Sequence, residues 1–271
     1  MWETLRKHRH PTIATVYYSF TEWNGLRPPR WIGWRNYQLM MNDYMFSNAI
    51  QNTFRYWIVG AIGIMGLSLL IAVLLNSKVL RSKQFFKTST FLPYVCASVA
   101  MGLIFRMLFE EHAGLVNEVI VSLGGSRIPW LTTSAYAWIP VVILFIWRLT
   151  PWFTMIILSG LLNISDEYYE AATVDGASGW QQFLRITLPL LNNILFFCFI
   201  TITVDAWRLF NESHILSGPG TSNTSLFELM YTSAFTNFKL GYGSALGVVL
   251  IVILLGISLI QFMVRRRTGE I

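Results

Sequence analysis

The chain has 271 residues, of which 54% are hydrophobic and only 13% are charged. A water-soluble domain of this size could not cover so much apolar surface, so the composition excludes a soluble globular protein and indicates an integral membrane protein. The net charge of +6 does not indicate a nucleic-acid partner, because the basic residues stand at the ends of apolar runs and form no continuous stripe with aromatic residues.

Residues 11–21 form the first apolar stretch, and they are too few for a complete membrane crossing. Eleven helical residues extend about 16 Å, against roughly 30 Å of hydrocarbon core. A cleavable signal peptide is not expected, because the stretch is rich in Thr and Tyr and lacks a long leucine-rich core. We expect the outer part of a truncated first span, with the basic cluster Arg6–His10 reaching to the interface.

Five longer apolar runs follow, and each is long enough to cross a bilayer. Four carry no charge, and the fifth, residues 128–165, contains only Arg148. The runs are continuous and do not alternate, which argues against a β-barrel. With the partial span 11–21 they predict an all-α integral membrane protein of six transmembrane helices, forming one transmembrane domain over residues 1–271. The complete spans are expected at 55–75, 87–108, 135–162, 188–209 and 242–264.

The distribution of Lys and Arg predicts how these spans are oriented. If the amino terminus is cytoplasmic, the inside segments hold 11 of the 20 basic residues and the outside loops hold 5, while the others lie in or beside spans. Because positive residues accumulate on the cytoplasmic side, we expect both termini inside the cell and a multi-pass plasma membrane protein. The loop 163–187 is then cytoplasmic.

This loop is acidic and predicts two short helices joined by a turn. Acids near its start favour the positive end of a first helix. Gly176 can take the positive φ with which helices commonly end. Ser178 and Gln181 have the spacing of a capping box, which starts a second helix. We expect that helix to end near Leu188, before a proline opens the next span.

One face of the first loop helix is suited to contact with another protein. Tyr168, Ala171, Ala172 and Asp175 share that face by their spacing, and the alanines permit close approach. Glu170 stands beside them and can accept a charge-assisted hydrogen bond from Arg or Lys. The alternative is a helix lying in the lipid headgroups, but such helices usually carry bases and large apolar residues. We interpret the loop as a docking surface for a basic partner.

Polar and charged side chains within the spans are candidates for a solute path, because charges at membrane depth usually face a protein interior or a water-filled route. They are Arg148, Thr201, Asp205 and Trp207. Asp205 and Arg208 are three residues apart, so a structural ion pair is an equally good interpretation for them. For Arg148 a structural role between helices is favoured over solute contact. Thr201 and Trp207 could equally hold helices together.

The loop also contains a longer motif: Glu170-Ala171-Ala172, Asp175-Gly176-Ala177, Phe183 and Ile186-Thr187-Leu188-Pro189. This spacing resembles the EAA loop of binding-protein-dependent ABC transporter permeases. Matches to the carbohydrate-uptake, maltose-type branch extend along most of the chain, although the first span is shorter than in that family. They include Tyr18-Ser19-Phe20, Asn52-Thr53, Leu92-Pro93, Ile146-Trp147-Arg148, Ser217-Gly218-Pro219-Gly220 and Gly241-Tyr242-Gly243.

The resemblance implies the permease subunit of an ATP-driven importer of a carbohydrate or related polar solute, in a bacterial or archaeal plasma membrane. It implies alternating access, with a second, usually different, permease chain, two cytoplasmic ATPase subunits and an extracytoplasmic solute-binding protein. The ATPases would dock on Tyr168, Glu170, Ala171, Ala172, Asp175 and Gly176.

ATP and Mg²⁺ would be used by the ATPases, since this sequence has no Gly-x-x-x-x-Gly-Lys-Ser/Thr loop. We expect the chain to have no catalytic residues and to be no enzyme itself. We also expect it to bind no cofactor or metal, and to contact lipid but not nucleic acid. Cys96 and Cys198 lie in apolar runs and are expected to be inert thiols.

Two other classes of protein remain open. An ion-coupled secondary transporter could use Asp205 as a proton relay and would need no ATPase, but it would be expected to show inverted repeats and several mid-membrane acids. The sequence offers one such acid and no repeat. A membrane scaffold that transports nothing is supported only by the short first stretch.

Overall fold

The computed structural model describes residues 11–77 and 82–267, and all structural statements below concern these residues. The basic cluster Arg6–His10 lies outside them. Nearly every element is helical. In chain order the elements are α2 (Pro11–Ser19), β1 (Thr21–Glu22), β2 (Arg30–Trp31), α3 (Arg35–Met41), α4 (Tyr44–Asn76), α5 (Lys83–Val95), α6 (Ser98–Leu108), α7 (Leu115–Ser122), α8 (Trp138–Leu162), α9 (Asp166–Val174), α10 (Gly179–Gln182), the π-helix η1 (Phe183–Thr187), α11 (Leu188–Trp207), α12 (Asn211–Ile215), α13 (Leu226–Tyr231), the π-helix η2 (Thr232–Thr236) and α14 (Leu240–Arg267).

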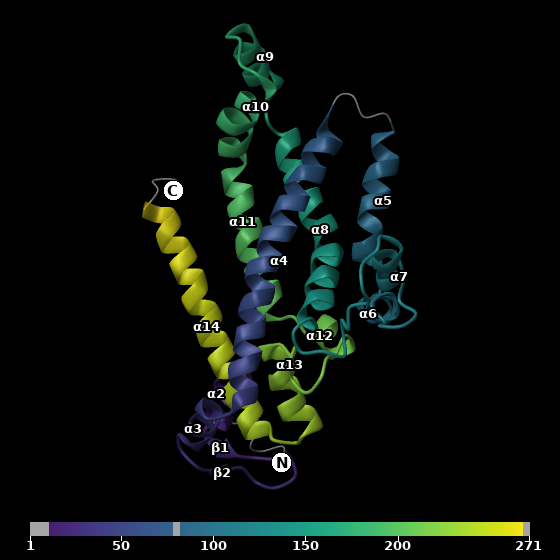
Figure 1. Cartoon of the computed structure of the whole chain (residues 1–271). Helices are drawn as coiled ribbons and strands as arrows, with labels where there is room; N and C mark the ends of the chain where they lie inside the picture. The colour runs from purple at the N-terminus through teal and green to yellow at the C-terminus, as the bar shows by residue number, and fades with distance from the viewer. Residues whose placement is uncertain (1–10, 78–81, 268–271) are drawn as a thin grey trace.

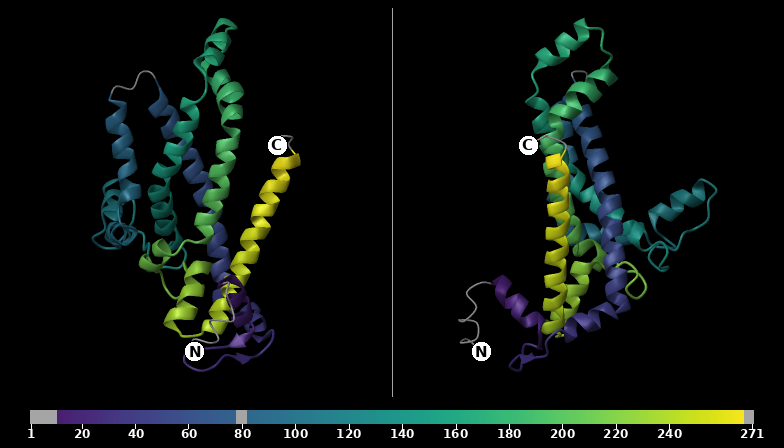
Figure 2. Two further views of the ribbon diagram at one scale, coloured as in Figure 1. Left: turned by 180° about the vertical axis from the view of Figure 1, so that it is seen from behind. Right: turned by 90° about the vertical axis from the view of Figure 1, so that its left-hand side faces the viewer.

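The long helices α4, α8, α11 and α14 run along one direction, and the short elements gather at their two ends (Figure 1). Helices α9 and α10 project from one end. The hairpin of β1 and β2, together with α3, lies at the other end. The described end of α14 points towards the α9–α10 end, which is visible from both further sides of the molecule (Figure 2).

The centre of the fold is the contact between α4 and α8. Both helices bury apolar side chains there, among them Ile64, Phe145 and Phe153. A Cβ added at Gly60 would lie 2.7 Å from the ring of Phe145, so glycine at this position lets the two helices approach closely. The Ser68 hydroxyl also donates to the Thr150 carbonyl oxygen at 3.0 Å, which satisfies a polar group inside the apolar contact.

Among the described residues, four helical segments are long and apolar enough to span a membrane, and a bent pair could make a fifth. The four are α4, α8, the continuous segment from α10 to α12, and α14. The bent pair is α5 with α6, which meet at 91°. The span predicted at 87–108 falls on this bent pair, so its helix is broken near residues 96 and 97. Pro93 disrupts helical bonding near the end of α5, and Cys96 and Ala97 have extended backbone angles that turn the chain.

The described part of the first apolar stretch forms a helix of 9 residues, α2, which is shorter than a membrane-spanning helix. Helix α2 packs against α14, where a Cβ on Gly247 would contact Thr15. The following turn is fixed by the Asn36 amide, which donates to the carbonyl oxygens of Ser19 and Thr21 at 2.8 and 2.9 Å. The Asn36 side chain thus ties α3 to the end of α2.

The second loop helix does not end before α11, contrary to the prediction. Helix α10 passes through the π-helix η1 directly into α11. Pro189 explains the wide turn, because it has no N–H and its ring would clash with a carbonyl group in a regular helix. The π turn, closed by a bond from the Leu188 N–H to the Phe183 oxygen, lies just before the proline. The loop is therefore joined to α11 as one helix.

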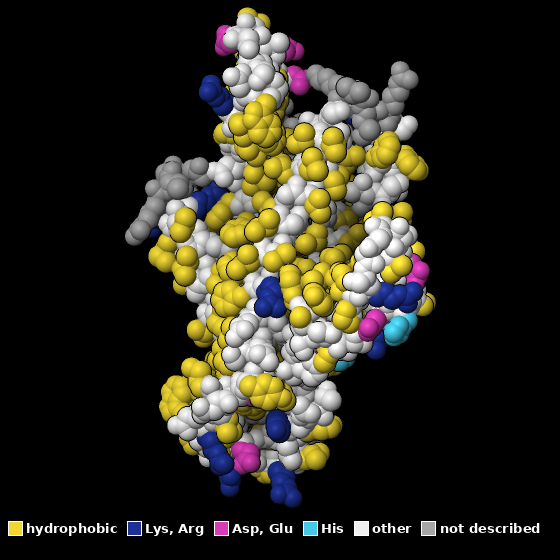
Figure 3. Space-filling view, viewed as in Figure 1, with side chains coloured by type: hydrophobic (Ala, Val, Ile, Leu, Met, Phe, Trp, Pro, Cys, Tyr) yellow, Lys and Arg dark blue, Asp and Glu magenta, His cyan; other side chains and the backbone are white. Residues whose placement is uncertain are grey.

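The surface separates into an apolar middle and more polar ends. In Figure 3 hydrophobic side chains cover the middle of the visible face, and most charged side chains lie towards the two ends or on the α6–α7 side. Large exposed apolar residues include Ile62, Phe197 and Leu259. Such a surface is suited to lipid or to another membrane chain rather than to water.

Candidate functional site

The α9–α10 loop has the helix ends that its sequence predicts. The Ser165 hydroxyl accepts from the Glu167 N–H at 3.3 Å and caps α9. At the other end Gly176 has φ +77°, and the Ala177 N–H bonds the Ala172 oxygen at 2.9 Å, as in a Schellman motif. Ser178 and Gln181 form the predicted capping box of α10. Local chemistry thus fixes a sharp elbow between α9 and α10.

Two side-chain contacts hold this elbow in shape. The hydroxyl groups of Tyr169 and Thr187 are 2.9 Å apart, which joins α9 to the π turn. The Gln182 amide donates to the Thr173 hydroxyl at 3.0 Å and joins α9 to α10. Because α10 continues into α11, a force applied to α9 has a short covalent and hydrogen-bonded route to a membrane-spanning helix.

The outer surface of α9 is left for other contacts. An open pocket of about 500 Å³ is lined by Asp166, Tyr169, Glu170, Thr173 and Val174. Val174 is 88% exposed and lies one turn from Glu170, so an acid and an unburied apolar side chain are adjacent. No ion pair is found for Glu170 within the described part of the chain. The Glu170 carboxylate and the exposed Val174 side chain together suit a partner protein that offers a Lys or Arg side chain and an apolar surface.

Of the predicted docking residues, only Glu170 lines this pocket. Tyr168, Ala171 and Asp175 are exposed on the adjoining surface of α9, Ala172 is half-buried, and Gly176 forms the turn. Tyr169, Thr173 and Val174 also line the pocket, although they were not predicted as docking residues. With Asp166 and Glu170 they follow the same three- and four-residue helical spacing as the predicted face that begins at Tyr168. The sequence pattern could therefore have identified them as an adjacent face of α9.

The charged groups predicted for a solute path lie together, but with an unpredicted partner. Arg148 of α8 donates through Nε to Glu212 Oε1 of α12 at 2.6 Å, and the Glu212 side chain is only 3% exposed. Asp205 is half-buried and lies within electrostatic range of Arg148, Arg208 and Glu212. The Asp205–Arg208 ion pair, which was the alternative interpretation of these two residues, is absent from the described residues, in which Arg148 pairs with Glu212 instead. Glu212 lies too far along the chain for spacing to have revealed it.

The remaining two candidates are held by their own surroundings. The Thr201 hydroxyl donates to the Phe197 oxygen at 2.9 Å. Trp207 is fully buried, and its ring meets Phe54 edge-on at 5.0 Å between centroids. Its Nε1 has no hydrogen-bond partner among the described residues. Thr203, two residues after Thr201 in α11, joins three helices: its hydroxyl oxygen accepts from Trp57 of α4 and Gln261 of α14.

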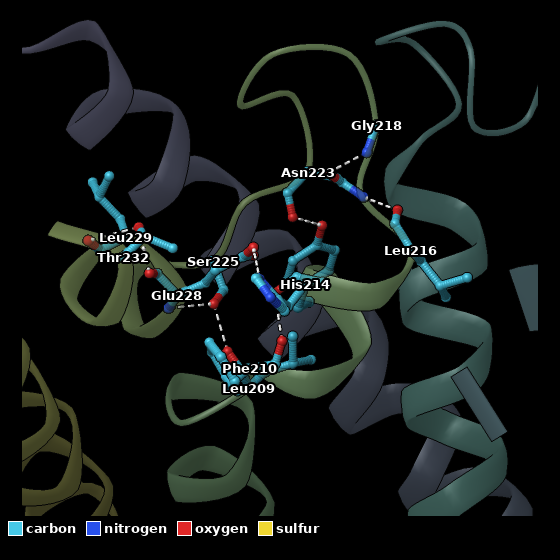
Figure 4. Close-up of polar contacts among 12 residues, drawn as sticks. Leu209, Phe210, His214, Leu216, Gly218, Asn223, Ser225, Glu228, Leu229 and Thr232 are labelled. Carbon is cyan, nitrogen blue, oxygen red and sulfur yellow. Dashed lines mark hydrogen bonds and ion pairs between the residues drawn. The ribbon is translucent and has the colours of Figure 1, made fainter. Parts of the chain in front are cut away.

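The segment after Trp207 is held by a network of polar contacts, shown in Figure 4. His214 Nδ1 and Glu228 Oε1 are 3.1 Å apart and connect α12 with α13. The Asn223 side chain accepts from the Gly218 N–H at 2.9 Å and donates to the Leu216 oxygen at 2.5 Å. The Ser225 hydroxyl donates to the Leu209 oxygen and accepts from the Glu228 N–H. The loop matched as Ser217–Gly220 is thereby fixed to its neighbours.

The described residues contain no group of three or more His, Cys, Asp or Glu side chains placed to hold a metal ion. The charged cluster around Arg148 and Glu212 is mixed in sign, so the groups can balance one another without a bound cation.

Comparison with known proteins covers nearly the whole chain. Residues 64–270 match the family described as binding-protein-dependent transport system inner membrane component. The chain is 31% identical over 257 residues to the probable ABC transporter permease protein YurN of Bacillus subtilis, which covers 93% of this chain and 88% of the relative. It is 32% identical over 234 residues to the arabinooligosaccharides transport system permease protein AraP of the same organism, with 85% and 74% covered. The lactose transport system permease protein LacF of Rhizobium radiobacter is 30% identical over 264 residues, with 95% and 88% covered.

A solved structure has the same fold. The crystal structure of a bacterial ABC transporter involved in the import of the acidic polysaccharide alginate contains a chain that superimposes with a TM-score of 0.83. The match covers 98% of this chain and 93% of that chain at 20% sequence identity.

Proposed function

The chain belongs to the family of binding-protein-dependent transport system inner membrane components, and on that premise we propose that it is the permease subunit of an ATP-driven importer of a carbohydrate or related polar solute. As a permease of this family it is a membrane component and not itself an enzyme. The solute class is supported by relatives whose names refer to arabinooligosaccharides, lactose and trehalose or maltose.

The proposed partners follow from the same family. They are a second permease chain, two cytoplasmic ATPase subunits and an extracytoplasmic solute-binding protein. In our proposal ATP and Mg²⁺ are bound by the ATPases, and this chain binds neither. The proposed location is a bacterial or archaeal plasma membrane, with the α9–α10 elbow and the carboxyl terminus in the cytoplasm.

The observation that carries the coupling proposal is an exposed acidic helix, α9, set between two long apolar helices and bonded to one of them. Glu170 and Val174 face outwards in an open pocket, while Tyr169 and Gln182 fix the elbow to α10 and η1. A basic ATPase surface could pair with Glu170, and Tyr168, Ala171, Ala172, Asp175 and Gly176 would widen the contact. Closure of an ATPase dimer would then be transmitted as a rigid-body movement.

The solute path is proposed to pass the polar side of α8 and α11. Arg148 and Asp205 are the groups there with partly accessible side chains, and Thr201 adds a hydroxyl. Trp207 is buried in this conformation, so it could contact solute only after a rearrangement of α11. Alternating access supplies two such global states, one open to each side.

The alternative, an ion-coupled secondary transporter, would make Asp205 a proton relay. The sequence offers one such mid-membrane acid and no internal repeat, whereas this class of transporter is expected to show inverted repeats and several mid-membrane acids. We therefore propose ATP as the source of energy.

Reconstitution tests this function. The complete complex, with its ATPases and solute-binding protein, is placed in proteoliposomes and uptake of radiolabelled sugars is measured with and without internal ATP. We expect uptake only with ATP and the binding protein. Uptake driven by a proton gradient alone, or no uptake of any sugar, would overturn the proposal.

A further inference from the structure

A second pocket lies at the opposite end of the molecule, beside the first turns of α4. Its volume is about 390 Å³, within the range of small-molecule binding sites. One wall is α4, with Tyr44, Asn48, Gln51 and Arg55. The other wall is the loop 219–222, and Ser134 closes one side.

The α4 wall is a single polar stripe. Steps of three and four residues between Tyr44, Asn48, Gln51 and Arg55 place the side chains above one another on a helix. The other side of the same helix is buried, as Ala49 and Tyr56 show. Helix α4 is therefore fixed by its apolar side while the polar stripe stays open.

The opposite wall is held rigidly. The Asn52 amide donates to the carbonyl oxygens of Ser222 and Thr224 at 2.9 and 3.2 Å. The Tyr56 hydroxyl donates to the Asn223 oxygen at 2.6 Å. A bond from the Ser222 N–H to the Pro219 oxygen closes a turn in which Gly220 has φ +59°. A pocket whose backbone is already ordered loses less entropy when it binds a ligand.

The polar groups of the pocket have few internal partners. In the described structure the side chains of Tyr44, Asn48 and Ser134 make no hydrogen bond, and Arg55 makes no ion pair. The Arg55 guanidinium lies 5.2 Å from the centre of the Trp138 ring, which orients it. No acidic side chain lines the pocket.

This set of groups fits hydroxyl-rich ligands better than simple anions. Amide and hydroxyl side chains both donate and accept hydrogen bonds, as sugar hydroxyl groups do. Arg55 could hold a carboxylate or phosphate, but the amide oxygens of Asn48 and Gln51 add acceptors to which a sugar hydroxyl can donate and an anion cannot.

We propose that this pocket is an outer subsite that binds the neutral, hydroxyl-rich part of a saccharide before it reaches the membrane path. The inference rests on the proposed function for the class of solute and for the side of the membrane. It assigns ligand contact to Asn48, Gln51 and Arg55, and a supporting role to Asn52.

The test is sugar binding to the permease–ATPase complex without ATP and without the solute-binding protein. The complex is placed in nanodiscs of phosphatidylcholine, and saturation-transfer NMR is recorded with maltotriose, arabinotriose, lactose and a trisaccharide of uronic acids. We expect at least one neutral sugar to bind. Asn48→Ala and Arg55→Ala should each weaken its affinity about fivefold to tenfold, the equivalent of one or two lost hydrogen bonds.

Asn42→Ala and Arg35→Ala are matched controls, because they remove the same residue types from exposed positions in and beside α3, outside the pocket. Both should bind sugar as the wild type does. The proposal is overturned if no neutral sugar binds, if only the uronic acid binds, if phosphatidylglycerol displaces the sugar, or if the pocket variants bind normally. Such results with ATP-driven uptake intact would contradict the subsite alone, whereas loss of wild-type uptake would contradict the proposed function.

Discussion

At the scale of single residues, Glu170 is the side chain on which the coupling proposal depends. It is exposed, lines the α9 pocket and has no ion pair among the described residues. We expect Glu170→Lys to insert in the membrane at normal levels but to abolish transport, because a like charge would face the basic partner. ATPase activity stimulated by the binding protein, together with uptake, measures the effect.

Glu167→Lys is the matched control, since Glu167 is an exposed acid of the same helix outside the pocket. It should retain most uptake. Equal activity of both variants and the wild type would exclude a docking role for Glu170.

The Arg148–Glu212 pair should matter for stability, whatever its role in transport. Glu212 is almost fully buried, so Arg148→Met would leave an unpaired carboxylate and cost about 3–5 kcal/mol of unfolding free energy. The double variant Arg148→Met/Glu212→Leu removes both charges and should recover most of that loss. Thermal unfolding of the purified complex measures it, and additive losses in the two single variants would show that the groups act independently.

The loop between α6 and α7 should lose stability in acid. The Ala113 N–H donates to Glu110 Oε2 at 2.5 Å, and this bond, supported by one from His112, holds the pKa of Glu110 below its usual value. A lowered pKa in the folded state stabilises the loop above the ordinary value of 4.5, and this contribution disappears as the pH falls through the folded pKa.

Amide exchange at Ala113 tests this dependence. Its protection factor should be high near neutral pH and fall in acid, and Glu110→Gln should remove the change. Protection that does not vary with pH in the wild type would contradict the assignment.

At the scale of elements, the elbow depends on one glycine. Gly176 has φ +77°, so Gly176→Ala should strain the turn by about 1–2 kcal/mol. Gly179 lies at the first position of α10 with open space around it, so Gly179→Ala should be neutral or stabilising. Hydrogen exchange of the α9 amides would show faster opening only in Gly176→Ala. The same behaviour in both variants would mean that φ at Gly176 is not limiting.

The elbow could be predicted because it is fixed by local interactions. The features that depend on long-range packing could not be predicted from the sequence. Gly176, Ser178 and Gln181 act on atoms within a few residues, so their effects could be read directly from the sequence. The bend between α5 and α6 was missed because a continuous apolar run has the same composition whether the helix is straight or broken. Glu212 was missed because it meets Arg148 only after the chain has folded.

The helix that contains the predicted span 55–75 extends well beyond it. Helix α4 begins at Tyr44, before the apolar run. Its first turns are polar, and one side of them is buried against the 222–226 segment through Asn52, Thr53 and Tyr56. Tertiary contacts therefore extend the helix beyond its apolar part.

At the scale of the whole molecule, the two ends have different chemistry. One end presents the acidic elbow, and the other presents the polar pocket of α4 together with exposed Trp31 and Trp34. Between them lies an apolar middle with exposed side chains such as Leu255 and Leu259. We infer that this middle faces lipid and, if the proposed function holds, a second permease chain.

The measurement that tests the account most directly is the side of the membrane on which the elbow lies. Ser178→Cys is made in a chain whose own cysteines, Cys96 and Cys198, are replaced by alanine, and Gln38→Cys in α3 serves as the control for the opposite end. Intact cells are treated with a membrane-impermeant maleimide. We predict labelling of the cysteine at position 38 in intact cells and of the one at position 178 only after permeabilisation. Labelling at position 178 from outside the intact cell would contradict it.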